Sequence, residues 1–463
     1  MVREKYDIVV LGGGTGGYST AFRARELGLS VALVERDRLG GTCLHRGCIP
    51  AKSLLQAANL LEAVRRAPTF GLEVTGDFNW GRVMTRKTEV VAGIYEGLRG
   101  LAKVRGVEMV AGTGRLLEED KVMVDSGSGD TTSLSFERLV LATGSRPRTL
   151  PGLETSGPIM TSDEALDIPE LPGSVAVIGG GYIGVEFASL WRSFGVDVTI
   201  VETAPRLMGR EDEEISTALT AALRARGIDI YSTVRLGSVE ATGRDGGAVV
   251  DFGARGETRT VKADRVLVAV GRETVTDAFD GTGIEMEAGH VKTGARLETS
   301  RPGVYAVGDL LASPQLAHAA FAEGVFVAEE LAGEAPEPID YRALPHCVYT
   351  HPEVAAVGLT EAEARDAGYD VVVVRESFGA VARARIAGEP EGSIKVVLVK
   401  DGPVLGVHMI GPGVSELISE AMLLTGWEAE AADVAKLIHP HPTLSEALGE
   451  AALKAAGKPL HSA

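Results

Sequence analysis

The sequence predicts an α/β fold built on two copies of one unit, because three features recur at a fixed spacing. Glycines in the pattern G-x-G-x-x-G follow an apolar run at Gly12 and again at Gly179. A second apolar run then ends in an acid, Glu35 in one copy and Glu202 in the other. Each position shifts by 167 residues, from 12 to 179 and from 35 to 202. One such motif is a weak signal, whereas two with the same spacing indicate two Rossmann-like, three-layer dinucleotide-binding units.

In the first copy, a strand, a helix and a second strand are expected over residues 8–35. Gly12 is expected to make the tight turn, Gly14 to let a pyrophosphate approach, and Gly17 to let the helix pack on the strand. The phosphates would lie at the free N–H groups of the helix N-terminus. Glu35 is expected to accept hydrogen bonds from ribose hydroxyls.

The second copy differs from the first in what surrounds its acid and in its length. The carboxylate of Glu202 repels a 2′-phosphate and favours NAD, although Arg206 and Arg210 follow closely and keep NADP open. Both copies close on an apolar strand ending in Ala-x-Gly, at Gly144 and Gly271. The first copy is 40 residues longer between its first glycine and this ending (132 against 92), and its extra length includes a cysteine pair.

That pair, Cys43 and Cys48, lies in the stretch GGTCLHRGCIPAKSLL. Gly47 allows the irregular turn that would bring the two thiols together, and Pro50 is expected as the first residue of a helix. Cys48 would then lie at a helix N-terminus, where the dipole favours a thiolate. The pair therefore indicates a redox dithiol, with two unpaired packing cysteines as the alternative.

Composition excludes several classes of protein. Lys and Arg total 46 against 64 Asp and Glu, a formal charge of −18, which argues against nucleic acid and anionic membranes as partners. An apolar run of about 20 residues is missing, so no membrane span is expected. No signal peptide is visible, and three cysteines in 463 residues suit a reducing cytoplasm. Cys347 is expected to be a packed or idle thiol.

The cysteine stretch at 40–55, together with the two glycine motifs, resembles the class I pyridine nucleotide–disulfide oxidoreductases. The closest similarity is to the branch that oxidises dihydrolipoyl groups, and it covers essentially the whole chain. The resemblance implies that electrons pass from a protein-bound dihydrolipoyl group through a Cys43–Cys48 disulfide and FAD to NAD+. Cys43 would exchange with the substrate and Cys48 would face the flavin. Lys52 would lie by the flavin N5 and pair with Glu186, or else be a helix-surface lysine.

The resemblance also assigns the two cofactor sites. Asp309 would bind the ribityl chain, the backbone at Ala317 and His318 would touch the flavin ring, and Tyr182 would cover the nicotinamide or only pack. Residues expected at FAD are Gly12, Gly14, Gly17, Glu35, Thr42, Lys52, Gly114, Thr143, Gly144, Asp309, Ala317 and His318. Residues expected at NAD are Gly179, Gly181, Tyr182, Ile183, Gly184, Glu186, Glu202, Val234 and Gly271. No metal site is expected.

The C-terminal third has no dinucleotide pattern and is predicted to be α+β. Thr360 and Glu363 form a capping box that opens a helix, and strands are expected near 371–378 and 393–399. This region resembles the family's interface domain, which forms a homodimer. The expected domains are 1–149 and 272–341 for FAD, 150–271 for NAD, and 342–463 for the interface.

The segment LIHPHPTLSEAL at 437–448 has more than one interpretation. Thr443 and Glu446 form a capping box, so Glu446 could simply cap a helix. His439 and His441 could bind a metal, but no Cys, His or acid cluster accompanies them. The resemblance implies that His441 is the general acid and base, that Glu446 orients its imidazole, and that both serve the partner subunit's disulfide.

The resemblance implies two kinds of partner: a second copy of the chain, and the lipoyl domain of a 2-oxoacid dehydrogenase or glycine cleavage complex. The alternatives are a related NAD(P)H-dependent disulfide or quinone reductase, or a flavin-binding redox sensor. A sensor without turnover would need neither the cysteine pair nor the His–Glu pair.

Overall fold

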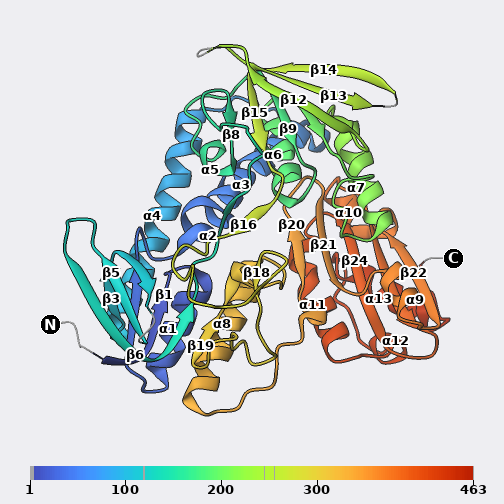
Figure 1. Ribbon diagram of the computed structural model, residues 1–463. Coiled ribbons are helices and arrows are strands. Elements are labelled where there is room, and N and C mark those ends of the chain that lie inside the picture. Colours follow the sequence, from blue (N-terminus) through green and yellow to red (C-terminus); the bar gives the residue numbers. More distant parts are fainter. Residues whose placement is uncertain (1–4, 118–119, 244–245, 255, 462–463) are drawn as a thin grey trace. The chain divides into compact units, whose positions relative to one another are not determined.

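The computed structural model describes residues 5–117, 120–243, 246–254 and 256–461, and the chain divides into two compact units. Unit 1 comprises Met1–Ser53, Met84–Arg148 and Arg272–Asp340. Unit 2 comprises Leu54–Val83, Thr149–Gly271 and Tyr341–Ala463. The boundaries at 53 and 84 fall inside two long helices, α3 (Cys48–Arg66) and α4 (Trp80–Val104). Each glycine motif lies in its own unit (Figure 1).

A seven-stranded sheet forms the centre of unit 1, in the order β3-β2-β1-β6-β5-β4 with β19 also paired to β6. The pairs among β1, β2, β3, β6 and β19 are parallel, whereas β4 and β5 are antiparallel to their neighbours. The strands are β1 (Lys5–Leu11), β2 (Val31–Glu35), β3 (Glu108–Ala111), β4 (Thr113–Leu116), β5 (Lys121–Asp125), β6 (Thr131–Leu141) and β19 (Val304–Ala306). The central strands are almost wholly apolar because both faces of a parallel sheet are covered.

The helices of unit 1 continue directly from the strand ends that the sequence motifs mark. Helix α1 (Thr15–Glu26) follows β1 and packs against α8 (Ala317–Ala332). The short helix α2 (Gly41–Arg46) follows β2. The remaining short elements are β7 (Ser145–Pro147) paired with β16 (Arg272–Thr274), β17 (Met286–Glu287) paired with β18 (His290–Val291), and the 3-10 turn η2 (Gly308–Leu310).

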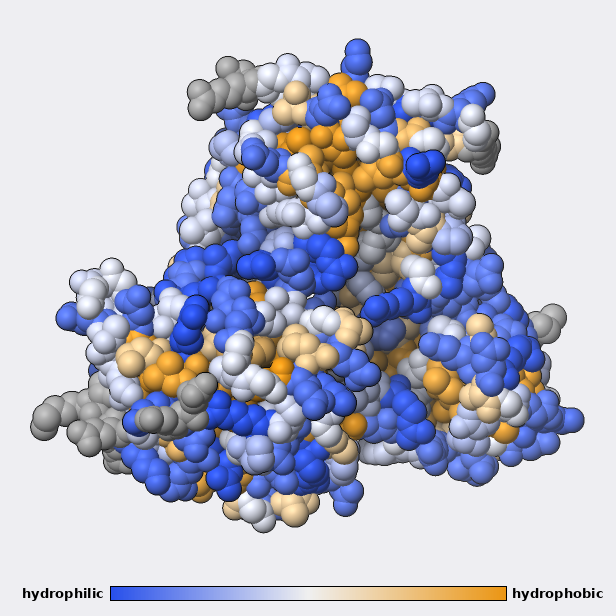
Figure 2. Space-filling model, viewed as in Figure 1, coloured by the Kyte–Doolittle hydropathy of each residue, from blue (hydrophilic) through white to orange (hydrophobic). Residues whose placement is uncertain are grey.

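Unit 2 holds a second parallel sheet, in the order β11-β10-β9-β15-β8. A three-stranded antiparallel sheet, β12-β13-β14, shares an apolar core with it. Apolar surface is visible in the upper part of Figure 2, where these strands lie, and several members of this core are only partly buried. The strands are β8 (Ile159–Met160), β9 (Ser174–Ile178), β10 (Asp197–Val201), β11 (Asp229–Tyr231), β12 (Arg235–Ala241), β13 (Ala248–Ala254), β14 (Glu257–Ala263) and β15 (Arg265–Val268). The helices are α5 (Ser162–Ala165), α6 (Tyr182–Ser193) and α7 (Glu213–Ala225).

The C-terminal part of unit 2 is an antiparallel sheet in the order β20-β21-β24-β23-β22. Helix α11 covers β21 and β24, and α13 covers β22 and β23. The strands are β20 (His346–Val348), β21 (Glu353–Gly358), β22 (Val371–Ser377), β23 (Ser393–Val399) and β24 (Val404–Gly411). The helices are α9 (Glu361–Asp366), α10 (Ala382–Ile386), α11 (Val414–Gly426), α12 (Ala431–Val434) and α13 (Glu446–Ala455), with 3-10 turns η3 (Tyr341–Ala343) and η4 (Phe378–Ala380). A further 3-10 turn, η1 (Ala67–Phe70), follows α3.

The starts of two helices can be compared with those expected from the sequence. The Thr360–Glu363 capping box predicted from the sequence opens α9, with both reciprocal hydrogen bonds formed. The helix expected to start at Pro50 instead starts at Cys48. The missing N–H of Pro50 is tolerated there because the first four N–H groups of a helix have no intrahelical acceptor. Within the described ranges, no helix is long and apolar enough to cross a membrane.

Candidate active site

The first glycine of each motif makes a turn that no other residue can make. Gly12 has φ of +108° and Gly179 has φ of +105°. A Cβ atom at either position would overlap a backbone carbonyl oxygen of the neighbouring strand end, Ala142 for Gly12 and Ala269 for Gly179. Both turns therefore require glycine for conformation and for space.

The other two glycines divide the remaining roles as the motif predicts. Gly14 and Gly181 are the N-caps of α1 and α6, and a Cβ on either would meet no atom within 4 Å. A Cβ on Gly17 or Gly184 would overlap the carbonyl oxygen of the first glycine of its own motif. In the described chain, neither helix start has a side-chain cap or an acid in its first turn. Open space beside uncapped N–H groups fits a dinucleotide pyrophosphate at both turns.

The acids that end β2 and follow β10 are tied to these turns in the same way. Glu35 accepts a hydrogen bond from the N–H of Gly13 at 2.6 Å, and Glu202 accepts one from Gly180. The second oxygen of each carboxylate accepts from the N–H two residues further along, at 2.7 Å in unit 1 and 2.6 Å in unit 2. Each carboxylate is therefore held beside a glycine turn, where it can accept a ribose hydroxyl, rather than standing free at a strand end.

The cysteine pair is brought together by the break between α2 and α3. Gly47 separates the two helices, and Cys48 is the first residue of α3. The two cysteines are reduced, with no disulfide between them, and both are half-buried. The hydrogen bond between Cys43 and Cys48, and then burial, raise the pKa of the Cys43 thiol. The site therefore contains a dithiol in which the Cys43 thiol keeps its proton while hydrogen-bonded to Cys48.

A clasp around Asp309 contains two residues that sequence reasoning missed. The hydroxyl of Ser145 donates to the Asp309 carboxylate. Arg272 donates to the Ser145 hydroxyl at 2.7 Å and lies 3.7 Å from Asp309. Ser145 and Arg272 each directly follow the Ala-x-Gly strand endings at 144 and 271, and that shared position was a signal in the sequence. The clasp fixes the carboxylate that the resemblance assigns to the ribityl chain.

The remaining residues assigned to FAD are distributed over the same unit. Thr42 lies in α2, Lys52 in α3, Gly144 follows β6, and Ala317 and His318 open α8. Thr143 donates to the carbonyl of Val275 at 2.5 Å. A Cβ on Gly114 would lie 2.6 Å from Leu11, so packing within the sheet also requires a glycine there. Their contacts to FAD stay predictions.

In unit 2, the residues assigned to NAD differ in their contacts and in how far their side chains are buried. The hydroxyl of Tyr182 donates to Glu211 at 2.5 Å, and burial followed by the Glu211 charge raises the pKa of the phenol. Glu186 accepts from the N–H of Tyr349 at 3.0 Å, and its pairing with Lys52 stays a prediction. Val234 is buried in the apolar core, so only its backbone could reach a nucleotide. Ile183 follows Tyr182 in α6, and Gly271 (φ +111°) lies beyond the end of β15.

His441 and Glu446 lie in contact, whereas the capping box expected from Thr443 and Glu446 does not open the helix. One oxygen of Glu446 lies 2.8 Å from Nδ1 of His441, and the other accepts from the N–H of Thr443 at 2.9 Å. Burial pushes the pKa of Glu446 up, but these two hydrogen bonds outweigh it and the pKa is lowered. Helix α13 begins at Glu446 itself, so Thr443 is not its N-cap. The imidazole of His441 is 70% exposed, held by its carboxylate and open to a substrate.

The surroundings of this pair explain the second histidine. His439 is ion-paired with Glu420 at 2.8 Å and its side chain is only 12% exposed. The preceding apolar residues Leu437 and Ile438 are 59% and 97% exposed. Among the described residues, no group of three or more His, Cys, Asp or Glu could hold a metal ion. His439 therefore braces the segment on which His441 stands, next to apolar surface that suits a protein contact.

Comparison with known proteins agrees with this arrangement. The profile of the pyridine nucleotide-disulphide oxidoreductases matches residues 6–324, and that of their dimerisation domain matches residues 344–452. A dihydrolipoyl dehydrogenase of Bacillus subtilis is 42% identical over 99% of both chains, and one of Chlorobaculum tepidum is 39% identical over 97% of both. The crystal structure of LpdA from Mycobacterium tuberculosis superposes with a TM-score of 0.90 at 26% identity, covering 98% of this chain and 99% of that one. The chain therefore belongs to the pyridine nucleotide–disulfide oxidoreductase family.

Proposed function

We propose that this chain is a dihydrolipoyl dehydrogenase that oxidises a protein-bound dihydrolipoyl group, using a Cys43–Cys48 disulfide, FAD and NAD+. The observation that carries the proposal is the hydrogen-bonded pair of thiols where α2 meets α3, in the same unit as the first glycine turn. Full-length relatives that carry the name dihydrolipoyl dehydrogenase support the same activity.

The reaction at sulfur is a pair of exchanges. In the oxidised enzyme, one substrate thiolate attacks Cys43, which forms a mixed disulfide and releases Cys48 as a thiolate. The second thiol of the substrate then attacks the substrate sulfur that is bonded to Cys43. This step forms the cyclic lipoyl disulfide and releases Cys43 in its reduced form. His441 of one subunit accepts the proton of the attacking thiol, and Glu446 stabilises the imidazolium that results.

The chain holds each cofactor with groups already described. FAD, when bound, accepts the electron pair from the reduced dithiol and delivers it as hydride to NAD+. The turn at Gly12–Gly17, Glu35 and the clasped Asp309 would bind FAD, and the turn at Gly179–Gly184 with Glu202 would bind NAD+. Open space beside Gly14 and Gly181 supports a pyrophosphate at each.

The quaternary arrangement follows from the C-terminal domain. The dimerisation profile covers His441 and Glu446, so the chain forms a homodimer whose C-terminal domain carries the pair. Each pair would serve the cysteines of the partner subunit, and the exposed Leu437 and Ile438 would be covered there. The enzyme would serve the lipoyl domain of a 2-oxoacid dehydrogenase or glycine cleavage complex in the cytoplasm. The domain boundaries at 149, 271 and 341 belong to this proposal.

One comparison of substrates tests the activity. NADH-linked turnover is measured with lipoamide, oxidised glutathione and a quinone under the same conditions. We expect lipoamide to be reduced fastest. Fast quinone reduction with no turnover of lipoamide would replace the proposal with a quinone reductase, and turnover of glutathione alone would indicate another disulfide reductase.

A cysteine series tests the residues. Cys43→Ser and Cys48→Ser should each abolish lipoamide turnover, because each removes one sulfur of the disulfide. Cys347→Ser is the matched control and should retain it, since Cys347 lies half-buried in β20 of the dimerisation domain, where its thiol is 4.0 Å from the Ser415 carbonyl. Normal turnover in Cys48→Ser would exclude the proposed exchange.

A further inference from the structure

The segment from Ala204 to Asp212, here called the strap, lies directly on the second glycine turn. The N–H of Met208 donates to the carbonyl of Gly180 at 2.8 Å. The side chain of Leu207 is fully buried, and a Cβ on Gly180 would overlap it. Glu211 adds a third contact by accepting the Tyr182 hydroxyl. The strap therefore touches the turn by backbone, by packing and by one short side-chain hydrogen bond.

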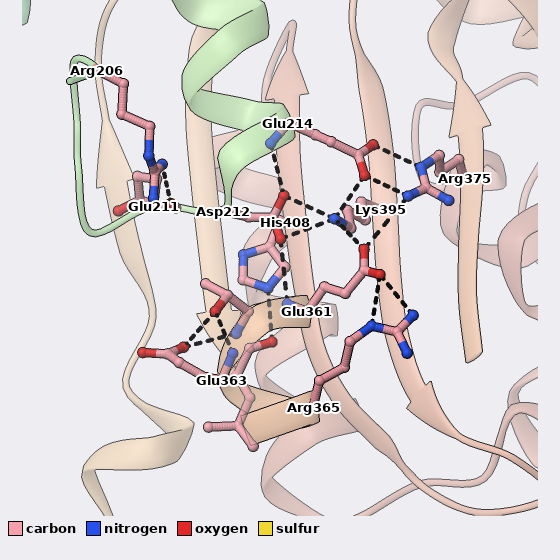
Figure 3. Close-up of polar contacts among 12 residues, drawn as sticks. Arg206, Glu211, Asp212, Glu214, Glu361, Glu363, Arg365, Arg375, Lys395 and His408 are labelled. Carbon is pink, nitrogen blue, oxygen red and sulfur yellow. Dashed lines mark hydrogen bonds and ion pairs between the residues drawn. The ribbon is translucent and has the colours of Figure 1, made fainter. Parts of the chain in front are cut away.

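The other side of the strap is anchored on the dimerisation domain. Glu211 is 2% exposed and lies 3.2 Å from Nδ1 of His346 on β20. Both oxygens of Asp212 lie 3.0 Å from Nζ of Lys395 on β23, and one of them accepts the N–H of Glu361 at 3.3 Å. Figure 3 shows Lys395 surrounded by carboxylates, with Asp212 at the start of α7. The side chains of Asp212 and Lys395 are 3% and 4% exposed, so this anchor is buried.

A hydrogen bond within the strap holds its two ends together. Arg206 donates to the backbone carbonyl of Glu211 at 2.7 Å, as Figure 3 shows. Burial would raise the pKa of the Glu211 carboxylate, but the nearby His346 and the hydrogen bond from Tyr182 outweigh it and lower the pKa, so the carboxylate stays ionised. Glu211 therefore faces the turn and the dimerisation domain at the same time.

In unit 1, an equivalent segment makes the same contacts with the first glycine turn. There the N–H of Gly40 donates to the carbonyl of Gly13 at 2.7 Å, the counterpart of the Met208 contact (40 to 208). Leu39 faces Gly13 as Leu207 faces Gly180. The same offset of 168 residues takes Cys43 to Glu211. The segment that carries the redox cysteine beside one dinucleotide turn thus carries an anchored glutamate beside the other.

We infer that Glu211 and Asp212 are positioning residues for NAD+, which make nucleotide affinity depend on the dimerisation domain. The inference rests on the proposed function in one respect, that NAD+ binds at the Gly179–Gly184 turn. A turn held in one conformation loses less entropy on binding, so loosening either end of the strap weakens binding. The dithiol exchange in unit 1 does not use the strap and is unaffected.

The experiment measures the Kd of NAD+ and of NADH by titration calorimetry on the flavin-loaded dimer. Glu211→Ala and Asp212→Asn are each expected to raise both Kd values about 3–10-fold. Glu211→Gln retains an acceptor for the Tyr182 hydroxyl and should restore most of the affinity. Glu214→Ala is the matched control: it removes a 2.8 Å ion pair with the same Lys395 but lies outside the strap, and it should leave both Kd values within about twofold.

A second measurement separates positioning from general damage. Flavin reduction by dihydrolipoamide without NAD+ should proceed at the wild-type rate in Glu211→Ala and Asp212→Asn. Unchanged Kd values in both variants, or equal losses in Glu214→Ala or in flavin reduction, would overturn the inference. Gly181→Ala identifies the site: if it leaves NAD+ binding intact, the nucleotide site of the proposed function is wrong and the strap with it. If it weakens binding while the strap variants do not, only the strap is wrong.

Discussion

Replacing Lys395 by Met should destabilise unit 2 far more than the loss of an ordinary ion pair. Nζ of Lys395 lies 3.0 Å from Asp212, 2.8 Å from Glu214 and 2.9 Å from Glu361, all drawn in Figure 3. Burial would lower the pKa of Lys395, but hydrogen bonds to these carboxylates outweigh it and raise the pKa, so the cation is retained. Methionine removes that cation and leaves three carboxylates.

The structure decides how large the effect is. Glu214 keeps its bond to Arg375, and Glu361 keeps its bonds to Arg365. Among the described residues, Asp212 keeps hydrogen bonds from the N–H groups of Glu214 at 3.0 Å and Glu361 at 3.3 Å but no arginine or lysine partner, although it is 3% exposed. Breaking a buried pair costs roughly 3–5 kcal/mol. Since two of the three acids retain an arginine, we expect the lower end, about 3 kcal/mol.

The assay uses a property of the sequence: the tryptophans, Trp80, Trp191 and Trp427, all belong to unit 2. Denaturant unfolding followed by tryptophan fluorescence therefore reports on that unit. Lys436→Met is the control, because its ion pair with Asp433 is exposed and its loss should leave the unfolding midpoint essentially unchanged. The double variant Asp212→Asn/Lys395→Met should be more stable than Lys395→Met, since it removes the stranded charge. Equal losses in Lys395→Met and Lys436→Met, or a double variant less stable than Lys395→Met, would refute the reasoning.

Four further substitutions have expected outcomes. Gly17→Ala should prevent folding of unit 1 because its Cβ overlaps the Gly12 carbonyl, whereas Gly14→Ala should fold and lose FAD, which absorbance of the purified protein measures. His441→Gln should slow lipoamide turnover by about 10²–10⁴-fold while NADH-driven flavin reduction continues; equal loss in both half-reactions would contradict its role as acid and base. Glu420 raises the pKa of His439, so this pair stabilises the fold fully below pH 6.5 and loses its effect as pH rises through the raised pKa. Glu420→Gln should therefore cost about 1.5 kcal/mol at pH 6 and less at pH 9, in the same fluorescence assay; a cost independent of pH would contradict this.

The sequence alone predicted the parts of this protein that depend on short-range spacing. The His441–Glu446 pair was expected from the family resemblance, not from spacing. The repeated glycine turns, the acids after them and the cysteine pair each lie within about 25 residues, and all were found as units. Spacing suffices there because a turn or a helix start fixes which neighbours can meet. The start of α3 at Cys48 rather than Pro50 marks the limit of that reasoning, since the first turn of a helix accepts proline at more than one position.

Only the tertiary structure decided which distant side chains complete the sites. Ser145 and Asp309 are 164 residues apart, and Asp212 and Lys395 are 183 apart. Tyr182 finds Glu211 because the strap folds back over the glycine turn. Such pairs depend on which strands become neighbours and on the burial that forces charged groups to find partners. The repeat in the sequence established that two glycine turns exist and that the cysteine pair follows the first, whereas packing established that the acids after the second are anchored on the dimerisation domain.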